Sequence, residues 1–253
     1  MSDQAERWSG VAKSYETEFI DPYLPEVRNP LPIALERISG RGSKTIADLG
    51  CGVGPLVPLL AKRFRRVYAI DFAEGMLARA RERCAELENV EFLRLGMTDL
   101  SSLAGRLDVA VAVNSLVLPD DRELETALQQ IHAALRPGGR FLGIVPAIDA
   151  VHYFTMLLVD RARQVGMPVS QARKNAAHHA EHSLYDFAFG DFRYQGIEQH
   201  FWQPFEVKHR LRRAGFRRVR LKKVRLAWHQ FGCSRDLGDL PAPWDWFFQA
   251  RRD

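Results

Sequence analysis

A glycine-rich loop beside an apolar run is the feature of this sequence best suited to holding a ligand. The loop reads Asp48-Leu49-Gly50-Cys51-Gly52-Val53-Gly54-Pro55 and follows the short run Thr45–Ala47. Glycine permits tight turns and lets a ligand approach the main chain closely. Asp71 ends the next apolar run, 21 positions after Gly50, the spacing at which a carboxylate reaches a ribose hydroxyl beside such a loop. These two features together predict a nucleoside-binding site.

The spacing of the glycines leaves two kinds of nucleotide ligand open. A dinucleotide fingerprint reads GxGxxG and places a pyrophosphate at the N-terminus of the following helix. Here the spacing is GxGxG, and Pro55 occupies the next position, where it suits the first residue of a helix. Pro58 must then lie in the first turn of that helix, because it would clash farther along. Since either match alone is weak, the rest of the chain must decide between them.

The elements around the loop alternate between short β-branched runs and amphipathic segments from residue 43 to residue 146. This alternation predicts a parallel sheet with helices on both faces. The predicted helix after Asp120 has a capping-box start and ends at the Pro/Gly turn Arg136-Pro137-Gly138-Gly139. The further predicted strands are Val67–Ile70, Val90–Leu95, Val109–Val113, Phe141–Val145, Phe216–Trp228 and Trp244–Ala250, and the predicted helices are Ala5–Phe19, Leu31–Ile38, Pro55–Phe64, Ala73–Leu87, Asp121–Leu135 and Pro204–Ala214.

Four segments follow from this pattern. Residues 1–42 are expected to form an N-terminal helical segment, and residues 43–147 the first half of a Rossmann-like domain. Residues 148–202 break the alternation and are expected to form a helical, aromatic insertion after the fifth strand. Residues 203–253 supply the last helix and the last two strands. Because open α/β sheets bind ligands at the carboxyl ends of their strands, the insertion is placed to act as a lid over a substrate.

An ordered set of motifs resembles the class I S-adenosylmethionine-dependent methyltransferases. The set covers roughly residues 43–250, so it is specific although each motif alone is common. The resemblance implies a seven-stranded, mostly parallel, Rossmann-like sheet, with S-adenosylmethionine as cofactor. The similar segments are Asp48–Gly54, Ile70–Leu77, Gly96–Leu100, Asp108–Leu116, Leu135–Leu142 and Leu211–Phe216.

The resemblance also implies roles for residues around the methionine part of the cofactor. Gly50 and Gly52 would pass under it, and Asp48 would fix the loop by accepting backbone hydrogen bonds. The backbone at Asn114 would face the methionine amino group. Tyr15 resembles an N-terminal aromatic residue that closes over the cofactor.

Further roles are implied around the adenosine. Asp71 would bind the ribose hydroxyls, and Phe72 would lie against the adenine. Asp99 would accept a hydrogen bond from the adenine amino group, with Met97 and Thr98 nearby. Structural alternatives stand beside these roles: Asp71 as a helix N-cap, Phe72 as core and Asp99 as a turn residue.

The insertion carries most of the chain's histidines, and His152, His182 and His200 are candidate proton acceptors by position alone. His178 and His182 have the i, i+4 spacing of metal ligands, but without a clear third ligand we expect no metal. The segment is also rich in aromatic residues, which suit either an organic substrate pocket or the insertion's own core. These are Tyr153, Phe154, Tyr185, Phe187, Phe189, Phe192, Tyr194 and Trp202.

Composition limits the function classes. The three scattered cysteines, Cys51, Cys84 and Cys233, form no CxxC pair, so we expect a reducing, cytoplasmic location. No stretch reaches the roughly 18 continuous apolar residues that a membrane helix needs, so we expect no membrane association. The net charge of +5 and the basic run Arg210–Arg225 could attract nucleic acid, but no interleaved aromatics offer stacking, so we expect none to bind. A small-molecule methyltransferase is therefore predicted. The alternatives are a methyltransferase acting on nucleic acid or protein, an NAD(P)-linked oxidoreductase and a non-methylating cofactor-binding protein.

Overall fold

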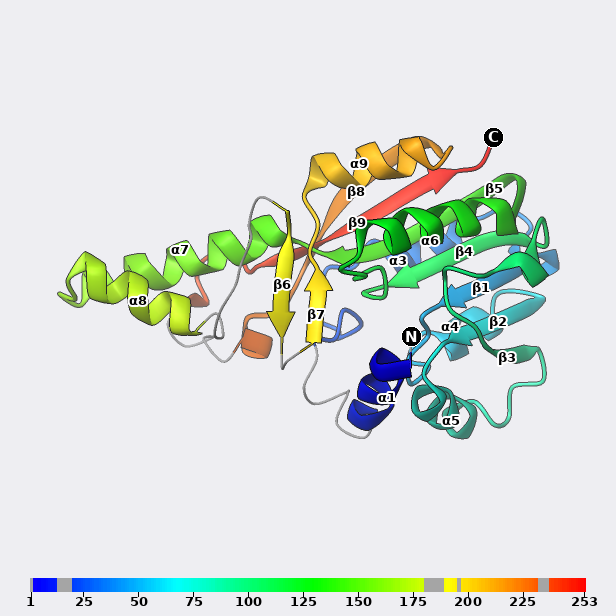
Figure 1. Ribbon diagram of the computed structural model, residues 1–253, viewed down its shortest axis with the longest axis horizontal. Coiled ribbons are helices and arrows are strands. Elements are labelled where there is room, and N and C mark those ends of the chain that lie inside the picture. The colour runs from blue at the N-terminus through cyan, green and yellow to red at the C-terminus, as the bar shows by residue number, and fades with distance from the viewer. Residues whose placement is uncertain (1, 13–19, 180–188, 195–196, 232–236) are drawn as a thin grey trace.

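The computed structural model describes residues 2–12, 20–179, 189–194, 197–231 and 237–253. Its main feature is a seven-stranded sheet in the order β3-β2-β1-β4-β5-β9-β8 (Figure 1). Strand β9 runs antiparallel to both of its neighbours, and the pairs formed by β1 to β5 are parallel, which confirms the mostly parallel sheet. The strands are β1 (Thr45–Leu49), β2 (Arg66–Asp71), β3 (Val90–Arg94), β4 (Leu107–Val113), β5 (Leu135–Pro146), β8 (Arg217–Arg225) and β9 (Trp244–Arg251).

Helices cover both faces of this sheet, as predicted. On one face, α6 (Asp121–Ala134) and α9 (Pro204–Arg213) bury apolar side chains such as Leu128 and Leu211 in one core. On the other face, a second core contains apolar residues of α3 (Leu31–Glu36), α4 (Val57–Ala61) and α5 (Glu74–Arg83). Helix α1 (Ser2–Val11) lies against α5 (Figure 1). Its Trp8 packs against a small apolar cluster that includes Met76. Two 3-10 turns, Arg41–Ser43 and Ser101–Leu103, connect these elements.

Proline and glycine set two boundaries differently from the sequence prediction. Pro55 lies outside the helix that follows the glycine loop, because α4 begins at Val57, while Pro58 lies in its first turn as predicted. The predicted turn Arg136–Gly139 belongs to β5 instead. Its backbone finds partners beyond the end of β9: Gly138 N–H donates to the Arg252 carbonyl at 2.7 Å, and Arg252 N–H donates to the Gly139 carbonyl at 3.0 Å.

The insertion after β5 begins with α7 (Ile148–Gln164) and α8 (Val169–His179), which extend away from the sheet (Figure 1). A hairpin of β6 (Asp191–Tyr194) and β7 (Ile197–His200) follows, and the sequence did not predict it. Several insertion aromatics pack within the fold: Tyr153 lies 5.3 Å from Trp244 between ring centroids, and Phe154 packs near Trp228 of the 3-10 turn Trp228–Phe231. These two residues therefore belong to a core, but that core is shared with the C-terminal part of the chain and is not the insertion's own.

No helix in the described ranges is both long enough and apolar enough to cross a membrane. Cys51 and Cys84 are free and buried, whereas Cys233 lies outside the described residues. Burial raises the pKa of the Cys51 thiol well above its usual value, and the nearby carboxylates of Asp48 and Asp71 raise it further. Cys51 is therefore a buried apolar filler, not a nucleophile.

Candidate functional site

A cavity lies at the carboxyl ends of β1, β2 and β4, and the glycine loop forms part of its wall. Gly50 has φ of 69°, and a Cβ at this position would come within 2.3 Å of the Ser115 Cβ, so the close approach of the β4 loop requires glycine. Gly52 has φ of 55°, and a Cβ there would meet nothing within 4 Å. Gly52 therefore presents its main chain to open space, the kind of cradle that a ligand fills.

The cavity has two lobes, and Gly50, Val113 and Asn114 line both. Elements from the whole chain contribute to the first lobe. It is lined by Gln4, Trp8, Gly50, Gly52, Asp71, Phe72, Met76, Leu95, Gly96, Met97, Thr98, Val113, Asn114, Ser115, Val117, Leu118, Pro119, Glu123 and Glu198. The second lobe is lined by Ile20, Asp21, Pro22, Tyr23, Asp48, Gly50, Cys51, Val53, Pro55, Leu56, Val113 and Asn114.

Asp71 connects the end of β2 to the glycine loop. Its Oδ2 accepts a hydrogen bond from Gly52 N–H at 2.9 Å, and its Oδ1 accepts one from Ala73 N–H at 2.9 Å. Burial raises the pKa of the Asp71 carboxyl, while these N–H groups oppose the shift. A carboxylate has about four lone-pair sites, so acceptor capacity remains for ribose hydroxyls in the first lobe. Asp71 thus combines the predicted ligand-facing position with a structural role.

Asp48 does not fix the loop, contrary to the role that the resemblance implied. Its carboxyl accepts no hydrogen bond within the described part of the chain, because the Gly52 amide is already taken by Asp71. It lines the second lobe and is only 3% exposed. Burial, and secondly the nearby charge of Asp71, raises its pKa to about 7. A buried carboxyl without a counter-charge favours a cationic ligand.

Asn114 lies where the two lobes meet and adopts a left-handed backbone with φ of 50°, which asparagine tolerates better than most residues. Its Nδ2 donates to Asp245 Oδ2 at 3.4 Å, while its Oδ1 is buried without a partner. Burial raises the pKa of Asp245 to about 7, with Asn114 and the Ala147 amide opposing the shift. The sequence analysis missed Asp245, which lies at the start of β9 and is distant in sequence.

Only some of the residues predicted to surround the adenine lie in the cavity. Phe72, Met97 and Thr98 line the first lobe. Asp99 is exposed and absent from the lining; its Oδ1 accepts hydrogen bonds from Ser101 N–H and Oγ. Glu123, which the sequence analysis used only as a capping residue, lines the lobe instead.

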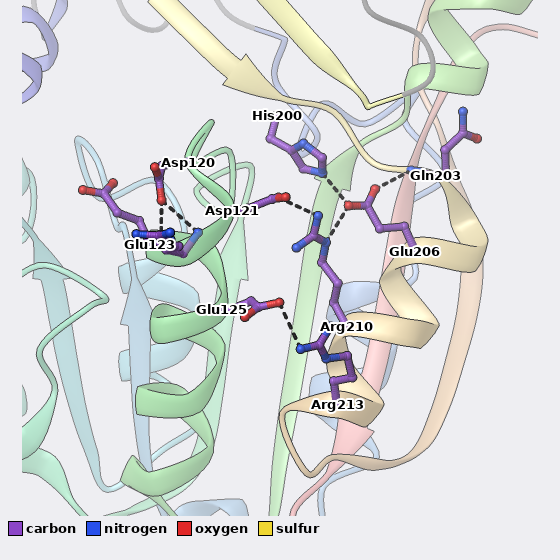
Figure 2. Close-up of polar contacts among 10 residues, drawn as sticks. Asp120, Asp121, Glu123, Glu125, His200, Gln203, Glu206, Arg210 and Arg213 are labelled. Carbon is purple, nitrogen blue, oxygen red and sulfur yellow. Dashed lines mark hydrogen bonds and ion pairs between the residues drawn. The ribbon is translucent and has the colours of Figure 1, made fainter.

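None of the candidate histidines in the described residues lines the cavity. His152 is exposed on α7, and His182, like Tyr15, lies outside the described residues. The side chains of His178 and His179 are also not described. His200 is buried on β7, with Nε2 2.9 Å from Glu206 Oε1 (Figure 2). This contact is an ion pair when the imidazole is protonated.

Glu206 contacts both His200 on β7 and Arg210 on α9. Arg210 donates to Glu206 Oε1 at 2.6 Å and to Asp121 on α6 at 2.6 Å, so the network ties the hairpin to α9 and α6 (Figure 2). Burial raises the pKa of Glu206, but the contacts with His200 and Arg210 outweigh it and leave that pKa lowered. The network is a structural connection behind the cavity wall rather than a proton acceptor within it.

Both lobes have the same electrostatic character. The charged side chains that line them are all carboxylates, and among the described residues neither lobe is lined by a lysine, arginine or histidine, although the chain has a net charge of +5. S-adenosylmethionine carries a sulfonium and an ammonium group, so the residues fit this cofactor. The anionic pyrophosphate of a dinucleotide fits poorly. No helix begins directly at the glycine loop to receive it either, because α4 starts only at Val57.

Comparison with known proteins agrees with this class of site. Residues 46–139 match the family model of a methyltransferase domain. A Geobacillus sp. (strain WCH70) protein, whose name assigns it provisionally to the methyltransferases, is 29% identical over 161 residues, which cover 62% of this chain and 65% of that protein. The chain thus spans less than two thirds of this relative's length.

Solved structures share the fold. An S-adenosylmethionine-dependent methyltransferase from Mesorhizobium loti aligns with a TM-score of 0.62 and 20% identity, covering 88% of this chain and 96% of that chain. The 1,6-didemethyltoxoflavin-N1-methyltransferase of Burkholderia thailandensis, solved with its substrate and S-adenosylhomocysteine, aligns with a TM-score of 0.58 and 18% identity, covering 88% of this chain and 77% of that chain. Fold and site together define a Rossmann-like nucleoside-binding protein. Residues 46–139 match a methyltransferase domain, and the fold of the chain is that of the S-adenosylmethionine-dependent methyltransferases.

Proposed function

We propose that this chain binds S-adenosylmethionine across the two lobes and transfers its methyl group to a small organic molecule that is neutral or carries an amine. The observation that carries this proposal is the lining of the cavity, which is acidic and, in the described part of the chain, contains no basic side chain. Such a lining attracts the cationic cofactor and disfavours carboxylate or phosphate groups on the acceptor. The Burkholderia structural neighbour acts on a small heterocycle, which supports the same substrate class.

The proposed contacts follow the lobes. Asp71 and Phe72 hold the ribose and adenine in the first lobe, with Met97 and Thr98 beside the purine. Gly50 and Gly52 provide the floor below the methionine. Asp48 and the Asn114 backbone face its ammonium group, and the partnerless Oδ1 of Asn114 is a further acceptor at the junction.

We assign the adenine amino group to Glu123 rather than Asp99. The Glu123 carboxylate shares the first lobe with Met97 and Thr98, whereas Asp99 is turned toward Ser101. Asp120 accepts from the Glu123 amide at 2.9 Å and so fixes the first turn of α6, which positions the Glu123 side chain at the lobe.

The cofactor supplies an already electrophilic methyl group, so the protein's task is to align the acceptor and exclude water. A protonated acceptor must also lose a proton. The carboxylate of Glu198 lines the first lobe and is the proton acceptor that we propose, in place of His152 and His200. Closure of the insertion over the acceptor remains a prediction.

Binding and turnover test the proposal separately. Calorimetry should show S-adenosylhomocysteine binding in the micromolar range or tighter, about −8 kcal/mol, and no NADH binding. Labelled methyl transfer should then be measured to a set of small amines, phenols and carboxylic acids, with amines and phenols as the expected acceptors. Tight NADH binding without S-adenosylhomocysteine binding contradicts the cofactor assignment; transfer only to the carboxylic acids contradicts the acceptor class.

A methyltransferase of nucleic acid or protein is the second candidate, because β8 contributes a run of basic residues at the edge of the sheet. Salt separates the two cases. Methyl transfer to a nucleic acid held by lysine and arginine falls steeply with salt, whereas transfer to a small neutral molecule does not.

A further inference from the structure

A second cavity, of about 170 Å³, lies on the strands β5, β9 and β8, away from the cofactor lobes. Its lining includes Leu142, whose side chain also belongs to the core under α3 and α4, so the cavity opens on that face of the sheet. Four arginines dominate it, and no acidic side chain of the described residues lines it. The lining residues are Arg140, Leu142, Arg218, Arg220, Gln249, Ala250 and Arg251.

The strand register brings these charges together directly. Arg140 on β5 pairs with Arg251 on β9, so two guanidinium-bearing residues stand opposite each other. In the next row on the same face, Gln249 lies between Leu142 on β5 and Arg220 on β8. Like charges directly opposite in a sheet are destabilising. Burial, and secondly the charge of Arg251, lowers the pKa of Arg140.

The fourth arginine reaches the cavity through an irregularity in β8. The register between β8 and β9 shifts between Arg217 and Arg220, and Arg218 within this bulge has φ of 54°. A left-handed backbone is uncommon for a residue other than glycine and costs free energy. Bulges redirect side chains, and this one places Arg218 in the cavity lining.

None of the four guanidinium groups has a carboxylate or hydrogen-bonding partner within the part of the chain that the structure describes. Arginines elsewhere do: Arg81 pairs with Glu74 at 2.8 Å. Asp108, on the neighbouring strand β4, is already held by Lys44, Arg136 and the Thr45 amide. Nothing in the described fold therefore offsets the repulsion in this cavity.

We propose that these residues form a four-arginine site, comprising Arg140, Arg218, Arg220 and Arg251, that binds the phosphate or diphosphate group of a small ligand. The planar guanidinium fork matches the geometry of phosphate oxygens and donates paired hydrogen bonds to them. The cavity is small, and its four arginines lie on three strands. A compact anion therefore fits it better than a polymer strand does. The site goes beyond the proposed methyl transfer, since the cofactor lobes share no lining residue with it.

Inorganic pyrophosphate is the probe, measured by calorimetry with the full chain at constant ionic strength. We expect saturable binding that weakens about tenfold or more in the double variant R140Q/R220Q. The matched control is R81Q/R163Q, which removes the same charge from two arginines already paired with acids. This control should bind pyrophosphate as the wild type does.

Two further measurements, the unfolding temperature and S-adenosylhomocysteine binding, make the outcome decisive. Because R140Q/R220Q removes like-charge repulsion, it should unfold at the same temperature as the wild type or higher. Pyrophosphate should stabilise the wild type and R81Q/R163Q more than it stabilises R140Q/R220Q. S-adenosylhomocysteine binding should be unchanged in both double variants, which separates this site from the cofactor site. Equal weakening in both double variants, no pyrophosphate binding by the wild type, or binding of a short DNA duplex in place of pyrophosphate would each overturn the proposal.

Discussion

Asp71 accepts a hydrogen bond from the Gly52 amide at 2.9 Å, although Gly52 lies 19 residues earlier in the chain. The second oxygen of the same carboxylate holds the Ala73 amide at the start of α5. One side chain therefore joins the glycine loop to the start of α5 at the wall of the first lobe.

Asp71→Ala should lower both S-adenosylhomocysteine affinity and stability. We expect affinity to fall by about 1–3 kcal/mol, because the ribose loses a charged acceptor, and the free energy of unfolding to fall by a similar amount, because two amides lose theirs. Calorimetry and denaturant unfolding measure the two effects. Glu74→Ala, which removes only an exposed ion pair with Arg81, is the control and should change each by less than about 1 kcal/mol. A folded Asp71→Ala variant with unchanged affinity would show that Asp71 serves only the loops.

Cofactor binding should depend on pH through Asp48. Its pKa is raised to about 7 in the free protein, and a bound ammonium group favours the ionised form. Affinity for S-adenosylhomocysteine should therefore fall below pH 7, by up to about tenfold per pH unit, and level off above it. Asp48→Asn should bind more weakly at pH 8 and show a flatter profile. An unchanged profile in this variant would place the titrating group elsewhere, with Asp245 next, since its pKa is also raised to about 7.

The ionisation of Asp48 should also make the stability of the ligand-free protein depend on pH. Because the folded pKa of Asp48 lies above its ordinary value of 3.8, the folded state binds the proton more tightly than the unfolded state. Its contribution is present at low pH and is lost as pH rises from about 4 to about 7. Asp48→Asn should therefore raise the free energy of unfolding at pH 8 by about 1–4 kcal/mol and leave it nearly unchanged at pH 4. Denaturant unfolding at both pH values measures this difference.

Glu206→Ala should be more damaging than loss of an ordinary surface ion pair. It removes the shared partner of His200 and Arg210, and we expect a loss of about 2–3 kcal/mol. Since the folded pKa of Glu206 is lowered, its contribution is present above about pH 4.5 and is lost as pH falls through the folded pKa. Glu125→Ala, which breaks a more exposed contact with Arg213, should cost less than about 1 kcal/mol. Equal losses in the two variants would mean that the buried network adds nothing.

The sheet could be predicted because its inner strands are buried on both faces and are therefore apolar throughout, as in β1 and β4. The hairpin β6–β7 was not predicted, because Asp191–Tyr194 and Ile197–His200 are only four residues long, and alternation over so few positions is a weak signal. The His200 backbone instead bonds to Val117 of the β4 loop, a contact made only after folding.

The candidate site likewise contains some residues that could be predicted from the sequence and others that could not. Gly50, Gly52 and Asp71 could be predicted because backbone freedom and carboxylate spacing are local properties of the sequence. Asp245 could not, because it reaches Asn114 only when β9 enters the sheet antiparallel beside β5, 131 positions later. Glu123 was visible as a capping residue, but nothing in its own helix shows that it faces the lobe.

Glu123 and Asp99 can be distinguished by the purine that the site accepts. A carboxylate that accepts from the 6-amino group should favour S-adenosylhomocysteine over its 6-oxo inosine analogue by about tenfold or more, because the 6-oxo group presents a second acceptor. Glu123→Gln should lose this preference, since an amide can donate to the 6-oxo group. Asp99→Asn should keep it, because Asp99 is occupied with Ser101 outside the lobe. Calorimetry with both ligands on the three proteins gives the comparison. If Asp99→Asn loses the preference while Glu123→Gln retains it, then Asp99 reads the adenine and its loop must rearrange on binding. If both variants retain it, the backbone at Met97 and Thr98 makes the distinction, and the acid that lines this lobe serves the acceptor instead.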